Sequence, residues 1–256
     1  MMDVCNSIKE SDNVLTFKKS NRTDTMNKDI RKIFYEVSHT YELVNHILTF
    51  GLDIVWRKKA TKIAAKEGGT MWLDVCTGTG EMAFCLHRLA NKETTVVATD
   101  FCIPMVYKAI KKFRTHQVFF SLADAMALPF RNETFDLVTI SFATRNININ
   151  QNILLGYFRE FYRILKPGGR FVNLETSQPP SNLLRKLFHL YILLAVGQIG
   201  YIISGSRDGY AYLSQTIPCF YSASNLANII RSAGFMEVDF YRMTFGLVAI
   251  HKAIKP

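Results

Sequence analysis

The chain has 256 residues, of which 48% are hydrophobic, so it can bury one sizeable core. Its net charge of +10 is carried by scattered lysines and arginines, which favours a generally solubilising surface over a dedicated site for an anionic partner. Five cysteines without a CxxC pair argue against a zinc site and for a reducing compartment, and neither a secretory signal nor about 20 uninterrupted apolar residues is found. We therefore expect a cytoplasmic protein with a single domain.

Two segments precede the first expected strand. Residues 1–25 are polar and rich in Ser, Asn, Asp and Lys, which predicts disorder. From residue 26 to residue 66, apolar residues recur every three or four positions with a break at Gly51, which predicts one or two helices. This segment, the N-terminal helical cap, could be an extra layer on a sheet or could cover a substrate. The periodicity alone favours the extra layer.

The stretch from Thr70 to Asp100 organises the rest of the chain. It contains an apolar run, a glycine turn, apolar residues at helical spacing and a β-branched run that ends at an acid. That order predicts strand, turn, helix and strand, with Gly78 and Gly80 letting backbone amides approach a ligand at a helix N-terminus. Asp100, at the tip of the second strand, could accept both hydroxyls of a ribose.

Two cofactors fit this unit. Gly78-x-Gly80-x-x-Ala83, followed by Asp100, also satisfies a loose dinucleotide fingerprint. Asp74 would repel a diphosphate, but it suits the sulfonium and ammonium groups of S-adenosylmethionine. The pattern Asp-x-x-x-Gly-x-Gly with a following acid resembles the class I S-adenosylmethionine-dependent methyltransferases. Cys76 stands where the general consensus of that class has an additional glycine, two residues before Gly78, which predicts a slightly wider turn.

The next strands carry further candidate ligands at their ends. Pro104 opens a helix that runs to about Thr115, and Val118–Ala123 is the expected third strand, which ends at Asp124-Ala125. Asp124 could accept a hydrogen bond from an adenine amino group, or it could cap a turn. The nearly apolar run 135–142 predicts a central parallel strand, and it is followed by Arg145-Asn146 in the crevice where open parallel sheets bind ligands.

An insertion separates the last strands. A helix over 151–165 is expected to stop at the break Lys166–Gly169, before a strand at 170–175. Residues 176–215 form the predicted lid insertion, with a helix over 181–203. Phe188 and Tyr191 on that helix could be buried structural residues or a wall for a lipophilic substrate, with a basic flank at a membrane surface.

The C-terminal part closes the predicted sheet. After a break at Pro218 we expect a helix over 222–233 and two tightly joined strands over 237–244 and 245–252. The fold class is therefore α/β, with a seven-stranded, mostly parallel sheet and helices on both faces, in a single domain over residues 26–256.

Further motifs run in unbroken order from about Ile33 to the C-terminus: Phe34–Asn45, Leu48–Gly51, Trp56-Arg57, Ala127–Phe130, Thr139–Asn146, Arg163–Gly169, Glu175–Pro179, Tyr210–Leu213, Ala233–Phe235 and Gly246–Lys252. Together they resemble the ubiquinone/menaquinone biosynthesis C-methyltransferases, the UbiE family. The resemblance implies a Rossmann-like fold and methylation of a ring carbon of a prenylated quinol with S-adenosylmethionine. It also implies cofactor contacts at Thr79, Asp100, Asp124, Ala125 and Ser141, to which we add Asp74, Gly78, Gly80 and Phe101.

The implied reaction needs a ring hydroxyl to lose its proton, because a ring carbon is otherwise a poor nucleophile. Arg145 is the candidate for holding the phenolate or for orienting a water that takes its proton. Tyr41 and His39 are the other catalytic candidates, although a lone His or Tyr on a helix is more often structural. The residues expected at the acceptor are Asn146, Tyr191 and Phe188, and no metal is required.

Departures from the family pattern leave the acceptor open. Ala143-Thr144, Gln178 and Glu42 differ from it, so another lipophilic or prenylated ring stays an alternative. The rival classes are an RNA or protein methyltransferase, a non-catalytic binder and a nicotinamide-dependent oxidoreductase. No amino-group methylation motif follows the fourth strand, which argues against the first. We expect a lipophilic small-molecule substrate and no nucleic acid, and we leave open a homodimer and peripheral membrane contact.

Overall fold

The computed structural model describes residue 35 and residues 39–113, 117–196 and 214–256. Within these residues, seven strands form one sheet in the order β3-β2-β1-β4-β5-β7-β6. Strands β1 to β5 run parallel, and β7 is antiparallel to both β5 and β6. This confirms the predicted sheet. The strands are β1 Met71–Val75, β2 Thr95–Asp100, β3 Val118–Leu122, β4 Phe135–Ser141, β5 Leu165–Thr176, β6 Met236–Met243 and β7 Val248–Ile254.

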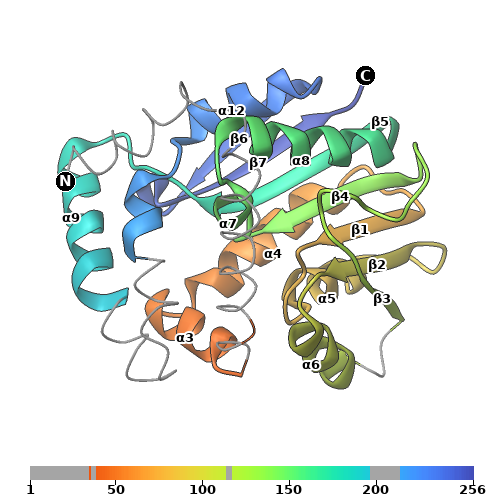
Figure 1. The fold of residues 1–256 in the computed structure, drawn as a ribbon, viewed down its shortest axis with the longest axis horizontal. Coiled ribbons are helices and arrows are strands. Elements are labelled where there is room, and N and C mark those ends of the chain that lie inside the picture. The colour runs from red at the N-terminus through yellow and green to blue at the C-terminus, as the bar shows by residue number, and fades with distance from the viewer. Residues whose placement is uncertain (1–34, 36–38, 114–116, 197–213) are drawn as a thin grey trace, which may run out of the picture.

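Helices cover both faces of the sheet (Figure 1). On one face lie α4 Leu52–Ala65 and α5 Glu81–His87, with α6 Ile103–Phe113 beside α5; on the other lie α8 Gln151–Ile164 and α12 Ala223–Ser232. Successive residues of β1 point to opposite faces, so Trp72 packs with α4 and α5, whereas Leu73 packs with α8 and α12. Both faces of the central strands are therefore buried, which explains their continuous apolar runs.

The order of the strands creates the crevice. From β1 the chain moves outward through β2 to β3, and it then returns to β4 on the other side of β1. The connections that follow β1 and β4 therefore diverge at the carboxyl ends of adjacent strands, and such a divergence leaves room for a ligand.

The N-terminal helical cap divides into two parts. In α4, the residues Trp56, Ala60 and Ala64 pack on the sheet, which matches the extra-layer interpretation. In contrast, α3 Tyr41–Leu48 packs its buried Val44 against the lid, where α9 Asn182–Tyr191 continues into the π-helical turn Ile192–Val196. Residues 1–25, and residues 197–213 of the expected lid, lie outside the described residues.

Several boundaries differ from those predicted. The helix α8 stops before Lys166–Gly169 as expected, but the strand begins at Leu165 and not at Arg170. Residues 166–169 belong to β5, with a register shift against β4, because Gly168 N donates to Lys255 O at 2.8 Å and Lys255 N donates to Gly169 O at 2.9 Å. A short helix that was not predicted, α7 Thr144–Ile147, follows β4. Pro218 lies inside a helical segment over 214–219. The last strand begins later than expected because Thr244 and Phe245 adopt positive φ values of 46° and 57° in a tight turn.

Two further observations concern the expectations from composition. No helix in the described ranges has both the length and the hydropathy needed to cross a bilayer. Cys76, Cys85 and Cys102 are free thiols.

Candidate functional site

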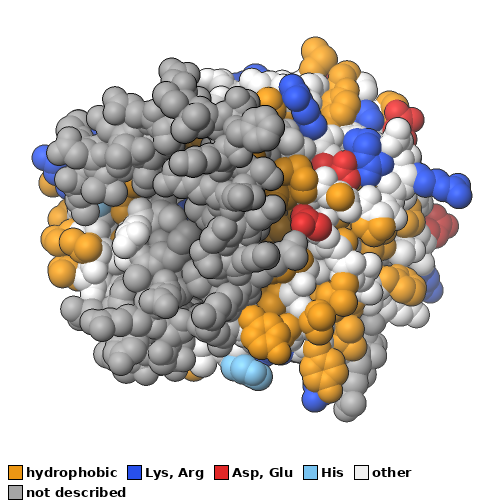
Figure 2. Space-filling view, viewed as in Figure 1, with side chains coloured by type: hydrophobic (Ala, Val, Ile, Leu, Met, Phe, Trp, Pro, Cys, Tyr) orange, Lys and Arg blue, Asp and Glu red, His pale blue; other side chains and the backbone are white. Residues whose placement is uncertain are grey.

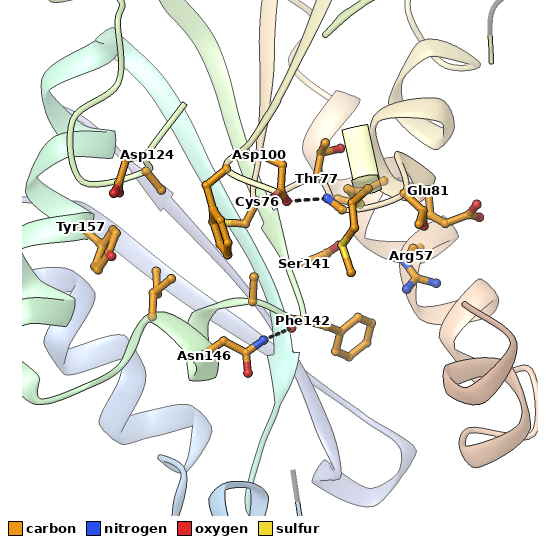
Figure 3. A pocket seen from close by; sticks show the side chains of 18 residues that line it. Arg57, Cys76, Thr77, Glu81, Asp100, Asp124, Ser141, Phe142, Asn146 and Tyr157 are labelled. Carbon is orange, nitrogen blue, oxygen red and sulfur yellow. Dashed lines mark hydrogen bonds between the residues drawn. The ribbon is translucent and has the colours of Figure 1, made fainter. Parts of the chain in front are cut away.

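A cavity of about 940 Å³, including its open mouth, lies at the carboxyl ends of β1, β2 and β4 (Figure 3). Its walls come from the loops after these strands and after β3, and from α4, α5, α6, α7 and α8. Seven of the nine predicted cofactor residues line it. They are Gly78, Thr79, Asp100, Phe101, Asp124, Ala125 and Ser141.

The turn after β1 has the backbone that its sequence predicts. Cys76, Gly78 and Gly80 have φ values of 52°, 55° and 85°, in the left-handed region that glycine adopts without strain. A Cβ atom at Gly80 would lie 3.1 Å from both the Ala109 Cβ and the Phe113 ring of α6, so this position also needs a residue without a side chain. Gly80 therefore acts through packing and does not itself line the cavity.

Asp100 organises the site from the tip of β2. Its Oδ2 accepts a hydrogen bond from Gly78 N at 2.8 Å, and its Oδ1 accepts one from Cys102 N at 2.8 Å. Burial raises the pKa of this carboxyl, although the backbone hydrogen bonds work in the opposite direction. Two amides thus fix the carboxylate on the cavity wall, and each oxygen retains a lone pair for a ligand hydroxyl.

Asp74 lies behind this wall and does not line the cavity. Its carboxyl is fully buried and accepts hydrogen bonds from Thr77 Oγ1 at 2.6 Å and Thr139 Oγ1 at 2.7 Å. Burial raises its pKa to about 7. Asp74 therefore ties the glycine turn to β4 through Thr77 and Thr139.

Asp124 combines the two roles considered from the sequence. Its Oδ1 accepts a hydrogen bond from Met126 N at 3.0 Å, as a turn cap does, and the residue also lines the cavity. Tyr157 of α8 lines the same cavity (Figure 3) and was not predicted. On the sequence it is one aromatic residue in an amphipathic helix, so no local pattern distinguishes it from the core.

The short helix α7 carries the two residues predicted at the acceptor side. Asn146 lines the cavity, and its buried Oδ1 has no hydrogen-bond partner among the described residues. Arg145 does not line the cavity. Its backbone N donates to Glu175 Oε2 at 3.0 Å, its Nη1 donates to Thr216 Oγ1 at 2.6 Å, and its buried Nε has no partner in the described part of the chain.

His39, Phe188 and Tyr191 are not among the described residues that line the cavity. His39 is exposed, and its carbonyl accepts a hydrogen bond from Lys108 Nζ at 3.3 Å. Tyr41 begins α3, and its side chain is outside what the structure describes. Phe188 and Tyr191 pack against the cluster between α3 and the lid, where Tyr191 Oη donates to Leu48 O at 2.6 Å. These contacts match the structural interpretation of the lid aromatics.

The residues that line the cavity fit S-adenosylmethionine better than a dinucleotide. The acids Glu81, Asp100 and Asp124 line the cavity, and they suit a ligand that carries a sulfonium and an ammonium. Gly78 N, which would face the diphosphate of a dinucleotide, donates to Asp100 instead. A Rossmann-like sheet with this glycine turn and these acids at the strand ends defines a class I S-adenosylmethionine-dependent methyltransferase.

Comparison with known proteins gives the family. The model of the ubiE/COQ5 methyltransferase family matches residues 22–255, and the chain belongs to that family. It is 34% identical over 226 residues to the ubiquinone/menaquinone biosynthesis C-methyltransferase UbiE of Desulfotalea psychrophila, covering 88% of this chain and 90% of that protein. It is 36% identical over 226 residues to the demethylmenaquinone methyltransferase of Thermus thermophilus, covering 88% of this chain and 100% of that protein.

Solved structures show the same fold at low sequence identity. A methyltransferase of Thermotoga maritima aligns with a TM-score of 0.64 at 18% identity, over 89% of this chain and 100% of that chain. A methyltransferase of Aquifex aeolicus aligns with a TM-score of 0.54 at 18% identity, over 77% of this chain and 89% of that chain. These likenesses support the fold, whereas the family match supports the enzyme class and S-adenosylmethionine as the cofactor.

Proposed function

We propose that the enzyme methylates a ring carbon of a prenylated quinol, such as a demethylmenaquinol or a ubiquinone precursor. The observation that carries the proposal is the extent of the cavity. It is lined both by Asp100 and Ser141, the residues predicted to contact the methyl donor, and by Asn146 and Ile147 of α7 on the predicted acceptor side. The relatives' names, which refer to ubiquinone and menaquinone biosynthesis, support the choice of a quinol.

When bound, S-adenosylmethionine would supply an electrophilic methyl group, its sulfur leaving as the neutral thioether while the methylated ring carbon loses its hydrogen as a proton. The chain's own residues have to hold the acceptor ring in line, favour its phenolate and exclude water. We assign the phenolate interaction to Arg145. Its position next to Asn146, and its buried Nε without a partner in the described residues, support this assignment.

A lipophilic acceptor also has to reach the site from a membrane, so we propose peripheral membrane contact through α9. Leu183, Leu187 and Leu190 are 67%, 54% and 49% exposed, and Arg185 and Lys186 flank them. Figure 2 shows hydrophobic side chains on the surface at this end of the molecule, at the left of the view. Co-sedimentation with anionic phospholipid vesicles tests this contact. The homodimer stays a prediction.

Turnover of labelled S-adenosylmethionine with a panel of short-chain demethylated quinols tests the function. We expect mass spectrometry to find one new methyl group on a ring carbon of at least one quinol. Donor binding without methylation of any panel member would refute the acceptor class and leave the family assignment in place. Strongly salt-dependent retention on nucleic acid would favour an RNA substrate instead.

A further inference from the structure

Arg57 is a cavity residue for which the proposed reaction has no role so far. It comes from α4, the residue is only 7% exposed, and it lines the donor cavity near Glu81 (Figure 3). Among the described residues that line this cavity, it is the single lysine or arginine. The other charged groups on the wall are acids, so the cavity has one point at which it can attract an anionic group.

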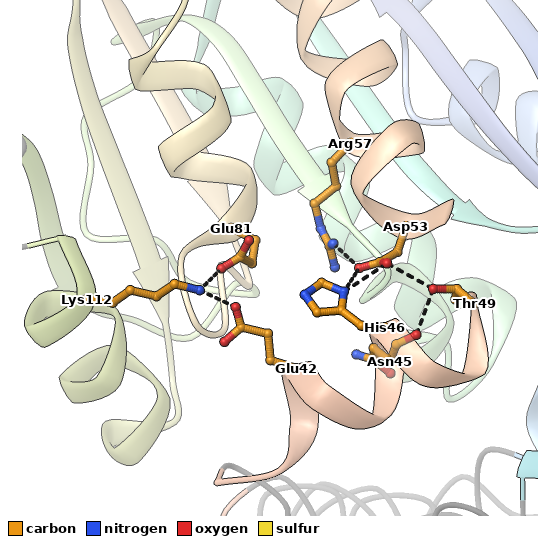
Figure 4. Close-up of polar contacts among 8 residues, drawn as sticks. All are labelled: Glu42, Asn45, His46, Thr49, Asp53, Arg57, Glu81 and Lys112. Atoms are coloured by element: carbon orange, nitrogen blue, oxygen red, sulfur yellow. Dashed lines mark hydrogen bonds and ion pairs between the residues drawn. The ribbon is translucent and has the colours of Figure 1, made fainter. Parts of the chain in front are cut away.

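A buried network fixes the guanidinium (Figure 4). Arg57 Nη1 donates to Asp53 Oδ2 at 2.5 Å, and Asp53 Oδ1 also accepts from Thr49 Oγ1 at 2.9 Å and pairs with His46 Nδ1 at 2.9 Å. Asp53 is 1% exposed. Although burial acts to raise the pKa of Asp53, the hydrogen bond with His46 and the charge of Arg57 hold it below its usual value.

The network leaves one edge of the guanidinium available. Because Nη1 bonds to Asp53, the Nε and Nη2 hydrogens on the other side of the fork can still donate, and Nε is buried without a partner among the described residues. The Phe142 ring lies 5.4 Å from Arg57 Cζ and shields the group from water. Two parallel N–H donors on one edge match the two oxygens of a carboxylate.

We propose that Arg57 binds the carboxylate of the methionyl moiety of S-adenosylmethionine, and that Asp53, held by His46 and Thr49, positions it. This inference rests on the proposed function only for the identity of the donor. With the adenosine at Asp100 and Asp124 and the carboxylate at Arg57, both ends of the donor are fixed. The sulfonium methyl group is then directed toward the acceptor side of the cavity.

The test compares two ligands that differ in one group. Calorimetric titration measures the dissociation constants of S-adenosylmethionine and of decarboxylated S-adenosylmethionine for the wild-type chain and for Arg57→Met, which keeps an apolar stem. We expect the variant to bind S-adenosylmethionine about 10- to 100-fold more weakly, the loss typical of a charge-assisted pair. Its affinity for the decarboxylated ligand should change less than about threefold.

Two further variants separate recognition from folding. Arg57→Met leaves Asp53 buried without its cation, so Asp53→Asn combined with Arg57→Met removes that charge and should show the same selective loss. Arg88→Met, at an exposed position after α5, is the matched control and should bind both ligands normally. Equal losses for the two ligands, or no loss for either, would overturn the proposal. Because the readout is binding, a failure to methylate any quinol would leave this test intact.

Discussion

Cys76 adopts a φ of 52° at the start of the cofactor turn, where the family pattern has a glycine. A side chain in this left-handed region costs roughly 1–2 kcal/mol, and a β-branched side chain costs more. The turn keeps the glycine-like backbone because the chain on both sides is fixed, by Thr77 N donating to Thr99 O at 2.9 Å and by Asp74.

We therefore expect Cys76→Gly to change the free energy of unfolding by less than about 1 kcal/mol, because the relief of strain offsets the greater freedom of glycine in the unfolded chain. Cys76→Val should destabilise the fold by about 2 kcal/mol or more and weaken donor binding. Urea unfolding and donor titration measure both effects. Equal stabilities for the Gly and Val variants would show that the turn relaxes to a different backbone.

Arg145 makes its anchoring hydrogen bond to Glu175 through the backbone, so replacing its side chain leaves that anchor in place. We expect Arg145→Ala to bind S-adenosylmethionine normally and to lose about 100-fold or more in kcat, as when a donor to a developing oxyanion is removed. Thr216→Val, which removes only the partner of Nη1, should cost less than about tenfold. Unchanged turnover in Arg145→Ala would exclude the residue from the mechanism.

At the scale of whole elements, one lysine joins three helices above the donor site. Lys112 Nζ of α6 contacts both Glu42 of α3 and Glu81 of α5 (Figure 4), and Lys108 Nζ lies 3.8 Å from Glu42 Oε2. An isolated ion pair at a partly exposed position contributes little, about 1 kcal/mol or less, but a lysine shared by two acids can fix a small helix. The cluster therefore ties α3 to the cofactor-binding half of the sheet.

Replacing this lysine should loosen α3 without unfolding the domain. In Lys112→Gln we expect amide hydrogen exchange over residues 41–48 to become several times faster, while exchange in α8 stays the same, because local opening of α3 costs less than global unfolding. Lys111→Gln, at an exposed neighbouring position on α6, is the control. Unchanged exchange in α3 would mean that its packing on the lid, through Val44, is what holds it.

At the scale of the molecule, two buried titratable groups act on stability in opposite directions. Burial lowers the pKa of His251 to about 4, and its Nε2 donates to Ala223 O at 2.8 Å. Between pH 4 and 6.5 the unfolded chain binds this proton and the folded chain does not, so the His251 contribution rises with pH. Asp74, with its pKa raised to about 7, holds its proton in the folded state, so its contribution falls as pH rises from 3.8 to 7.

The two slopes should nearly cancel in the wild-type chain between about pH 4 and 6.5. In His251→Gln only the contribution of Asp74 should remain of these two. The free energy of unfolding should then fall by roughly 3 kcal/mol as the pH rises over this range. Asp74→Asn should produce a rise of similar size over the same range. Urea titrations at half-unit pH steps measure these slopes, with the exposed His39→Gln as the control. If the free energy of unfolding depended on pH in the same way in all variants, the opposite contributions of His251 and Asp74 would be contradicted.

The sequence by itself determined the succession of strands and helices along the chain, the glycine turn and the acids at the strand tips, because these depend on local periodicity and on backbone conformations that few residues adopt. Only the tertiary structure decided which side chains meet in the cavity. It brought Arg57 and Tyr157, from helices on opposite faces of the sheet, into one cavity, and it left Asp74 out of the cavity lining. The packing of the helices on the sheet sets the directions in which their side chains point. The hydrophobic periodicity of a helix is the same whether its residues line a ligand cavity or the core.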